Sequence, residues 1–285
     1  MRMGVRFRWL VSVWLVAASL GAQADAANLA RAGIPFQFRE GLIRVQVRVP
    51  QTAEPLNFIL DTGAEVSVIG LQTMRRLGLK SGKRVAVRAV QSTTEGFWPV
   101  PIHATAGGVR LPMNFLALDL VSLSRACEIP VDGLIGADFF RGRIVQIDFE
   151  EEIVKPLKSY KPSVVEEVIP LQTRSGSLCA SIVVDGGAAE WARLDTGCAA
   201  ALQWVTSRPP PESCSRKMAI GLAAVSIPMS SASVRLGTLT FVDVPVGIHT
   251  QSLFPGESGL LGNGLLSRFR RVTVDSKAGR LLLQK

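Results

Sequence analysis

Two identical triplets, Asp61-Thr62-Gly63 and Asp195-Thr196-Gly197, are the residues best suited to chemistry in this 285-residue sequence. Two carboxyl groups that face one site can share a proton, so that one serves as general base on a water while the other serves as general acid. A lone triplet of this kind is typical of a turn, in which the Asp caps its own backbone and the Gly takes a positive φ. The two triplets indicate a pair of catalytic carboxyl groups, rather than two ordinary turns, only if their surroundings are duplicated as well.

The surroundings of the two triplets are duplicated in the same order. Each triplet directly follows a leucine, Leu60 in the first half and Leu194 in the second. Further along, each half has a block of two apolar residues between glycines: residues 133–136 read Gly-Leu-Ile-Gly and residues 259–262 read Gly-Leu-Leu-Gly. Random turns do not have matched partners, so this order predicts an internal repeat.

The elements that must position these triplets are mainly short strands. β-Branched segments bounded by Gly, Pro, Asn or Asp predict a mostly β protein, with strands at residues 42–49, 85–90, 144–149, 181–184, 233–239 and 271–274. Two short helices are predicted at residues 71–79 and 137–141. A polar, proline-bearing stretch at residues 155–170 predicts a connector between an N-terminal domain, residues 25–154, and a C-terminal domain, residues 171–285.

The N-terminus has the pattern of a signal peptide. Basic residues are followed by an apolar run at residues 9–22 and then by Ala22-Gln23-Ala24, the small-residue arrangement of a cleavage site. The run is shorter than the roughly 20 residues that a bilayer span needs. We therefore expect residues 1–24 to be removed and the mature chain to be exported, periplasmic or secreted, without a stable membrane span. An uncleaved membrane anchor is the alternative.

Composition excludes several other functions. With 47% hydrophobic and 19% charged residues the chain is globular rather than disordered. The net charge is +9, but aromatic residues make up 6% and do not interleave with the basic cluster at residues 80–88, so a nucleic-acid surface is not expected. The sequence has two histidines, no Gly-x-Ser-x-Gly elbow and no His-Glu-x-x-His motif, so neither a metal site nor a cofactor is expected.

The cysteines become interpretable once export is assumed. Four are present, an even number in a compartment where disulfides persist. We expect disulfide bonds among them, with the choice between three pairings left open. The four residues are Cys127, Cys179, Cys198 and Cys214.

On these motifs the sequence resembles the aspartic proteases, specifically their retroviral-type (retropepsin-like) branch. The resemblance implies two pseudo-symmetric β-barrel lobes in one chain with a cleft between them. It implies an aspartic-type endopeptidase that hydrolyses extended polypeptides with Asp61 and Asp195 as the catalytic pair. It also implies a monomer rather than a homodimer. A non-catalytic peptide-binding module of the same fold is the alternative.

The resemblance also implies roles for the neighbours of the aspartates. Thr62 and Thr196 would cross-link the two loops, and Gly63 and Gly197 would let backbone approach the carboxylates. Gly136 and Gly262 would let their strands pack beneath the loops. Ala64 and Cys198 replace the hydroxyl donors of pepsin-like enzymes, which predicts a pH optimum nearer neutral than pepsin's.

Two further features are less determined by the sequence. A candidate flap covers residues 91–102, with a hairpin tip at Thr94-Glu95-Gly96 and with Gly96, Phe97 and Trp98 over the substrate; ordinary packing is the alternative role of the two aromatic rings. The corresponding segment of the second half, residues 220–229, has no clear turn signal. Arg193 either forms a salt bridge on the outer surface or points inward, where it would perturb or disable the pair of aspartates.

Overall fold

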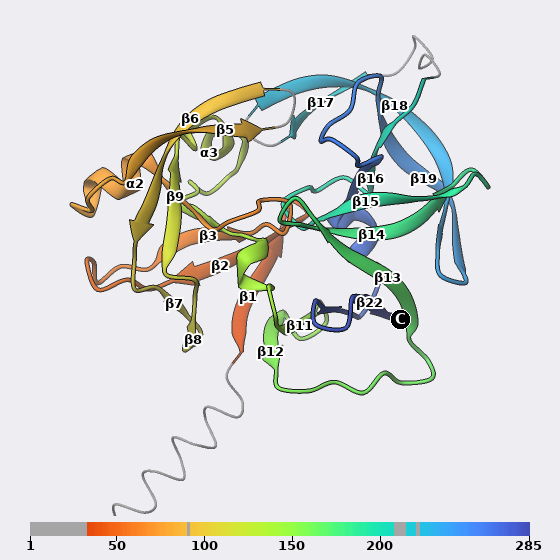
Figure 1. Cartoon of the computed structure of the whole chain (residues 1–285), viewed down its shortest axis with the longest axis horizontal. Helices are drawn as coiled ribbons and strands as arrows, with labels where there is room; N and C mark the ends of the chain where they lie inside the picture. Colours follow the sequence, from red (N-terminus) through yellow and green to blue (C-terminus); the bar gives the residue numbers. More distant parts are fainter. Residues whose placement is uncertain (1–32, 90–91, 208–214, 221–222) are drawn as a thin grey trace, which may run out of the picture.

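A computed structural model describes residues 33–89, 92–207, 215–220 and 223–285. The predicted signal peptide at residues 1–24 and Cys214 lie outside these residues. Strands account for most of the described chain, which confirms the mostly β prediction (Figure 1). Among the described residues, no helix is long and apolar enough to cross a membrane.

The first half of the chain consists of short strands with three short helical segments. In order, its elements are β1 (Ile34–Arg39), β2 (Leu42–Val47), β3 (Leu56–Leu60), β4 (Val68–Gly70), α2 (Leu71–Arg76), β5 (Lys83–Ala89), β6 (Ser92–Pro101), β7 (Thr105–Ala106), β8 (Val109–Arg110), β9 (Asn114–Leu118), α3 (Val121–Ala126), β10 (Gly133–Ile135), a 3-10 turn η1 (Ala137–Phe139), β11 (Ile144–Asp148) and β12 (Ile153–Leu157).

The second half has the same kinds of element in a similar order. Its elements are β13 (Glu167–Arg174), β14 (Ser177–Val184), β15 (Ala189–Asp195), β16 (Leu202–Val205), β17 (Ser215–Ile220), β18 (Ala223–Leu236), β19 (Leu239–His249), β20 (Gly259–Gly262), α4 (Asn263–Leu266), β21 (Arg271–Asp275) and β22 (Arg280–Gln284).

The strand pairings around each Asp-Thr-Gly triplet follow one pattern. In the first half β3 runs parallel to β10, β10 runs antiparallel to β4, and β4 runs parallel to β9. In the second half β15 runs parallel to β20, β20 runs antiparallel to β16, and β16 runs parallel to β19. Each triplet therefore begins where a buried strand meets a parallel neighbour formed by the glycine-flanked apolar block.

A six-stranded sheet joins the two halves, in the order β1, β12, β11, β21, β22, β13. The central pair β11 and β21 comes from opposite halves, and Asp148 on β11 faces Arg271 on β21. The Arg271 Nε donates to Asp148 Oδ2 at 2.6 Å, and the Asp148 side chain is fully buried. This sheet fixes the two halves relative to each other beneath the triplets.

A continuous apolar core supports the arrangement. It draws on both halves, with Phe58, Phe115, Phe139, Phe140 and Phe269 among its largest fully buried side chains. Fully burying a large apolar side chain contributes about 1.5–3 kcal/mol. The alternation of buried and exposed residues in β1 and β13 shows that these strands expose one face, as strands at the margin of a core do.

The predicted elements differ from the observed ones in several places. The helix predicted at residues 71–79 ends at Arg76, and the strand predicted at residues 233–239 spans the turn between β18 and β19. The segment predicted as a helix at residues 137–141 is a 3-10 turn at Ala137–Phe139, too short for an α-helical hydrogen-bond ladder. The predicted connector at residues 155–170 includes the end of β12 and the start of β13. Its Pro156 and Pro170 lie within strands that pair at these margins, a position that proline tolerates at sheet edges.

The expected disulfides are not supported by the structure. Cys127, Cys179 and Cys198 are all free. Cys179 lies on β14 opposite Arg193, whereas Cys198 follows the second triplet and Cys127 follows α3, so the three thiols occupy different surroundings. Burial raises the pKa of all three thiols. Cys179 and Cys198 are buried as well, which suits inert cysteines that pack as small apolar side chains.

Candidate active site

The structure brings the two Asp-Thr-Gly loops together at the junction of the halves. Asp61 follows β3 and Asp195 ends β15. A Cβ atom on Gly63 would lie 2.6 Å from the Asp195 carboxyl carbon, and one on Gly197 would lie 2.5 Å from that of Asp61. Each glycine therefore packs against the aspartate of the opposite loop, at a distance that no larger residue allows.

Reciprocal threonine hydrogen bonds lock the two loops. Thr62 Oγ1 donates to the Leu194 carbonyl at 2.6 Å and accepts from the Thr196 N–H at 3.0 Å. Thr196 Oγ1 likewise donates to the Leu60 carbonyl at 2.7 Å and accepts from the Thr62 N–H at 3.0 Å. Both threonines are fully buried, so these four bonds form away from competing water.

The two carboxyl groups interact directly, and their surroundings alter their acidity. Burial raises the pKa of Asp61, although backbone N–H donors from Ala64 and Gly63 lower it. Burial, followed by the negative charge of Asp61, raises the pKa of Asp195 to about 8. Two neighbouring carboxylates cannot both ionise cheaply, so the pair retains one shared proton over a wide pH range.

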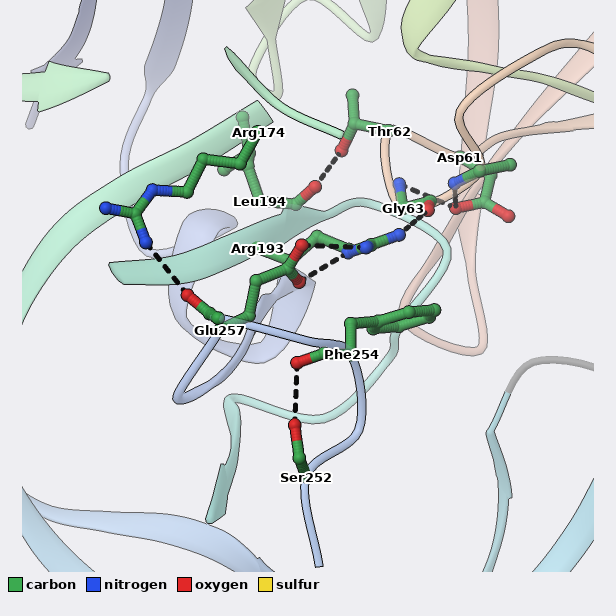
Figure 2. Close-up of polar contacts among 11 residues, drawn as sticks. Asp61, Thr62, Gly63, Arg174, Arg193, Leu194, Ser252, Phe254 and Glu257 are labelled. Carbon is green, nitrogen blue, oxygen red and sulfur yellow. Dashed lines mark hydrogen bonds and ion pairs between the residues drawn. The ribbon is translucent and has the colours of Figure 1, made fainter. Parts of the chain in front are cut away.

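Arg193 does not lie on the outer surface, where one of the two interpretations of the sequence put it. Its side chain is 3% exposed, and its Nε and Nη2 form a two-pronged ion pair with the Glu257 carboxylate, both at 2.7 Å. The remaining nitrogen, Nη1, donates to the Gly63 carbonyl at 2.8 Å, and the guanidinium lies 3.4 Å from the centre of the Phe254 ring (Figure 2). It is directed inward, yet its hydrogen bonds go to neither aspartate.

The supporting glycines lie directly beneath the loops. A Cβ atom on Gly136 would come within 2.6 Å of the Val66 carbonyl oxygen, and one on Gly262 within 2.3 Å of the Ala200 carbonyl oxygen. Ala64 packs at the edge of an apolar cluster, and Cys198 is buried beside Asp195. The absence of a side chain at the two glycines is what allows β10 and β20 to approach the loops.

The candidate flap is a hairpin, but its tip lies elsewhere than predicted. β5 and β6 pair in register from Lys83 opposite Trp98 to Ala89 opposite Ser92, so the connection falls at residues 90–91, outside the described residues. Gly96, Phe97 and Trp98 lie within β6, and a Cβ on Gly96 would meet the side chain of Leu118 at 2.8 Å. The glycine that looked like a turn is required by close packing against β9, and both aromatic rings pack against apolar clusters.

The second half also contains a hairpin in the equivalent place, which the sequence did not reveal. β17 pairs with β18 from Ser215 opposite Pro228 to Ile220 opposite Ala223. The first hairpin lies in the chain between β4 and β9, which run parallel to each other. The second hairpin lies between β16 and β19, which also run parallel to each other. The turn of the second hairpin lies at residues 221–222, outside the described residues.

Two further polar residues at the site carried no motif. Glu257, in the loop between β19 and β20, is 6% exposed and pairs with Arg193. Asn263, at the start of α4, donates through Nδ2 to the Thr196 carbonyl at 2.7 Å and to the Gly41 carbonyl at 2.8 Å. Asn263 directly follows the second glycine-flanked block, and this position was the only signal available for it.

Within the described residues, no cluster of His, Cys, Asp and Glu side chains could hold a metal ion. A hollow of about 520 Å³ lies in the first half, lined by residues that include Phe36, Gln46 and Thr105. No residue of either triplet lines it. The junction brings together two carboxyl groups and the backbone N–H groups around them.

Comparisons with known proteins agree with this geometry. Residues 45–139 match the family model described as aspartyl protease. The fold is similar to that of the aspartic proteinase from Irpex lacteus, with a TM-score of 0.56 at 14% sequence identity, over 89% of this chain and 96% of that one. A search of curated protein sequences finds no match. The family match over the first triplet and the fold over most of the chain confirm the resemblance to the aspartic protease family.

Proposed function

We propose that this chain is an aspartic endopeptidase whose catalytic pair is Asp61 and Asp195. The observation that carries the proposal is the reciprocal lock between the two loops, in which Thr62 and Thr196 each bond to the opposite strand. A lock of this kind fixes two carboxyl groups face to face, which ordinary turns do not do. The aspartyl protease match at residues 45–139 gives independent support.

The proposed reaction uses one ionised and one protonated carboxyl. The ionised carboxylate takes a proton from water as the water oxygen attacks the peptide carbonyl carbon, and the other carboxyl gives its proton to the carbonyl oxygen. The resulting diol then returns its hydroxyl proton to the pair while the C–N bond breaks and the leaving nitrogen takes a proton. Both carboxyls end as they began, and no cofactor is consumed.

The proposed substrate is an extended polypeptide, because a strand laid along sheet edges is recognised through its backbone. Partly exposed apolar side chains flank the first triplet, among them Val66, Val85, Val87 and Trp98. They pack against the same buried apolar cluster as Ala64, whose N–H donates to Asp61. We therefore expect apolar residues to be preferred beside the scissile bond.

The alternative of a non-catalytic binding module was motivated mainly by Arg193. Its hydrogen bonds go to Glu257 and to the Gly63 carbonyl, and none of them goes to either carboxyl group. Both aspartates come from one chain, so the proposal needs no second copy. We also propose that the protein is exported, on the pattern of residues 1–24, which N-terminal sequencing of the mature protein would test.

The test of the proposal is peptide-library cleavage by residues 25–285, from pH 2 to pH 9. We expect pepstatin-sensitive cleavage that is lost in Asp61→Asn and in Asp195→Asn, in a protein that sediments as a monomer. Because the pKa of Asp195 is raised to about 8, activity should fall as the pH rises through that region and the pair loses its shared proton. Cleavage that survives either substitution, or an optimum below about pH 3, would contradict the assignment.

A further inference from the structure

The two carboxyl groups of the proposed catalytic pair are held differently. Asp61 Oδ1 accepts from two backbone N–H groups, Gly63 at 2.9 Å and Ala64 at 3.2 Å. Asp195 Oδ1 accepts from the Gly197 N–H at 3.0 Å. The N–H groups of Ala64 and Cys198 both bond to the backbone carbonyl of the aspartate in their own loop at 3.2 Å, and of these two only the Ala64 N–H bonds to the carboxylate as well. Within the described residues, Asp61 therefore has one more backbone donor than Asp195.

The additional donor belongs to a peptide group that Arg193 also holds. The carbonyl of Gly63 and the N–H of Ala64 are the two ends of one planar peptide unit. The carbonyl end accepts from Arg193 Nη1 at 2.8 Å, and the N–H end donates to Asp61 Oδ1. A cation at the carbonyl oxygen polarises the unit and strengthens its N–H as a donor. It also fixes the orientation of this peptide unit.

Arg193 has no counterpart in the first half. The matching position there is Ile59, which is buried in the apolar cluster beside β10. The guanidinium is held in place on its other side by the Glu257 carboxylate and by the face of Phe254 (Figure 2). All three guanidinium nitrogens of Arg193 have a hydrogen-bond acceptor, so the side chain is held rigidly. These hydrogen bonds reach only one of the two triplets, at Gly63.

We propose that Arg193 is a positioning residue that makes the carboxyl pair unequal. By holding the Gly63–Ala64 peptide with its N–H facing Asp61, it directs the negative charge to Asp61 and the shared proton to Asp195. If the proposed hydrolysis is correct, on which this assignment of roles rests, Asp61 takes the proton from water and Asp195 protonates the carbonyl.

Several other groups face this cluster and belong to the charge balance. Glu257 offsets part of the positive charge of Arg193, and the thiols of Cys179 and Cys198 lie nearby. Arg174, on β13, donates to the Gly256 carbonyl of the same loop at 2.8 Å and lies over Trp191. The groups that face the carboxyl pair are thus Arg193, Cys198 and the backbone N–H groups, with Glu257, Cys179 and Arg174 behind them.

The inequality is measurable without any substrate. In Asp195→Asn the remaining carboxyl is Asp61, and in Asp61→Asn it is Asp195, so each titrates alone and the coupling disappears. Carboxyl carbon NMR of aspartate-labelled protein gives each value. We expect Asp61 to titrate at least one pH unit below Asp195. Equal values, or the reverse order, would overturn the proposal.

The role of Arg193 is tested in the same two backgrounds. Arg193→Met should raise the pKa of Asp61 by about one unit, raise that of Asp195 by less, and move the amide proton of Ala64 upfield. Glu257→Gln keeps the arginine but leaves its charge less balanced, so it should lower the pKa of Asp61. Glu257→Gln also serves if Arg193→Met does not fold. Arg174→Met is the matched control, because that arginine touches the same loop but not Gly63.

The results separate this proposal from the proposed function. If the chain cleaves no peptide but the two carboxyls titrate unequally and respond to Arg193, the hydrolase assignment fails and the positioning role stands. A shift of equal size in both carboxyls in Arg193→Met would show that the guanidinium acts only through space, and would overturn the positioning role. The positioning role is likewise overturned if Arg174→Met shifts the two carboxyls as Arg193→Met does.

Discussion

Replacing one proposed catalytic carboxyl should stabilise this protein, by an amount that grows with pH. In the unfolded chain Asp195 ionises near its ordinary pKa of 3.8, whereas in the folded chain burial and the charge of Asp61 raise its pKa to about 8. Folding therefore retains a proton that the unfolded chain has lost. The stability that this proton contributes is fully present below pH 3.8, and it is lost as the pH rises toward 8.

The size of this loss follows from the shift. Each pH unit between the two pKa values costs the folded state about 1.4 kcal/mol, which amounts to about 3 kcal/mol at pH 6. This is an upper value, because the carboxyl is partly exposed and water screens it. Asp195→Asn keeps the shape and the acceptor for the Gly197 N–H, so it should remove the loss without creating a cavity.

Urea unfolding of both proteins at pH 4, 5, 6 and 7 measures the effect. Asp148→Asn is a control of opposite sign: although burial raises the pKa of Asp148, bonds from Arg271 and the Glu151 N–H lower it overall. That variant should lose stability above pH 4, with the loss fading as the pH falls through the lowered pKa of Asp148. If Asp195→Asn is no more stable than the wild type at pH 7, or gains equally at pH 4 and pH 7, the reasoning about the carboxyl pair is wrong.

Three further predictions concern the loops and the thiols. Thr196→Val should destabilise the fold by about 2–5 kcal/mol in urea unfolding and abolish cleavage. The reason is that the buried Leu60 carbonyl loses its donor and the buried Thr62 N–H loses its acceptor. A loss of stability below about 1 kcal/mol would contradict this. Gly197→Ala should abolish cleavage, since its Cβ would lie 2.5 Å from the Asp61 carboxyl carbon, whereas Gly142→Ala, which has no atom within 4 Å of its Cβ and is strained only by its positive φ, should retain cleavage. In native protein, thiol labelling should modify the half-buried Cys127 and spare the buried Cys179 and Cys198 until unfolding. Protection of all three thiols would indicate disulfide bonds that the structure lacks.

The sequence indicated the two triplets and their partner strands because the relevant information is local and occurs twice. Each triplet is a contiguous turn that needs a small residue after Thr62 or Thr196, and each has its own glycine-flanked partner strand. The mostly β class followed from the short β-branched segments for the same reason. Repetition supplied the constraint that a single sequence otherwise lacks.

The features that the sequence did not predict depend on contacts between distant segments. Glu257 pairs with Arg193 across 64 residues of sequence, and nothing in its own neighbourhood marks it as a partner. Gly96 looked like a hairpin tip, but it is a strand residue that β9 approaches closely. The disulfides were inferred from the even number of cysteines, which says nothing of where the thiols lie.

The bonds that hold each acidic loop come from the opposite half of the chain. A protein divided at residues 158–166, where the described chain is irregular between β12 and β13, would yield two fragments, and each would present Thr62 or Thr196 without its counterpart. Neither fragment alone would contain both members of the proposed catalytic pair, while a mixture of both would bring them together only upon reassociation. Under the proposed function, cleavage of a reporter peptide by the mixture would therefore report that the two fragments have reassociated.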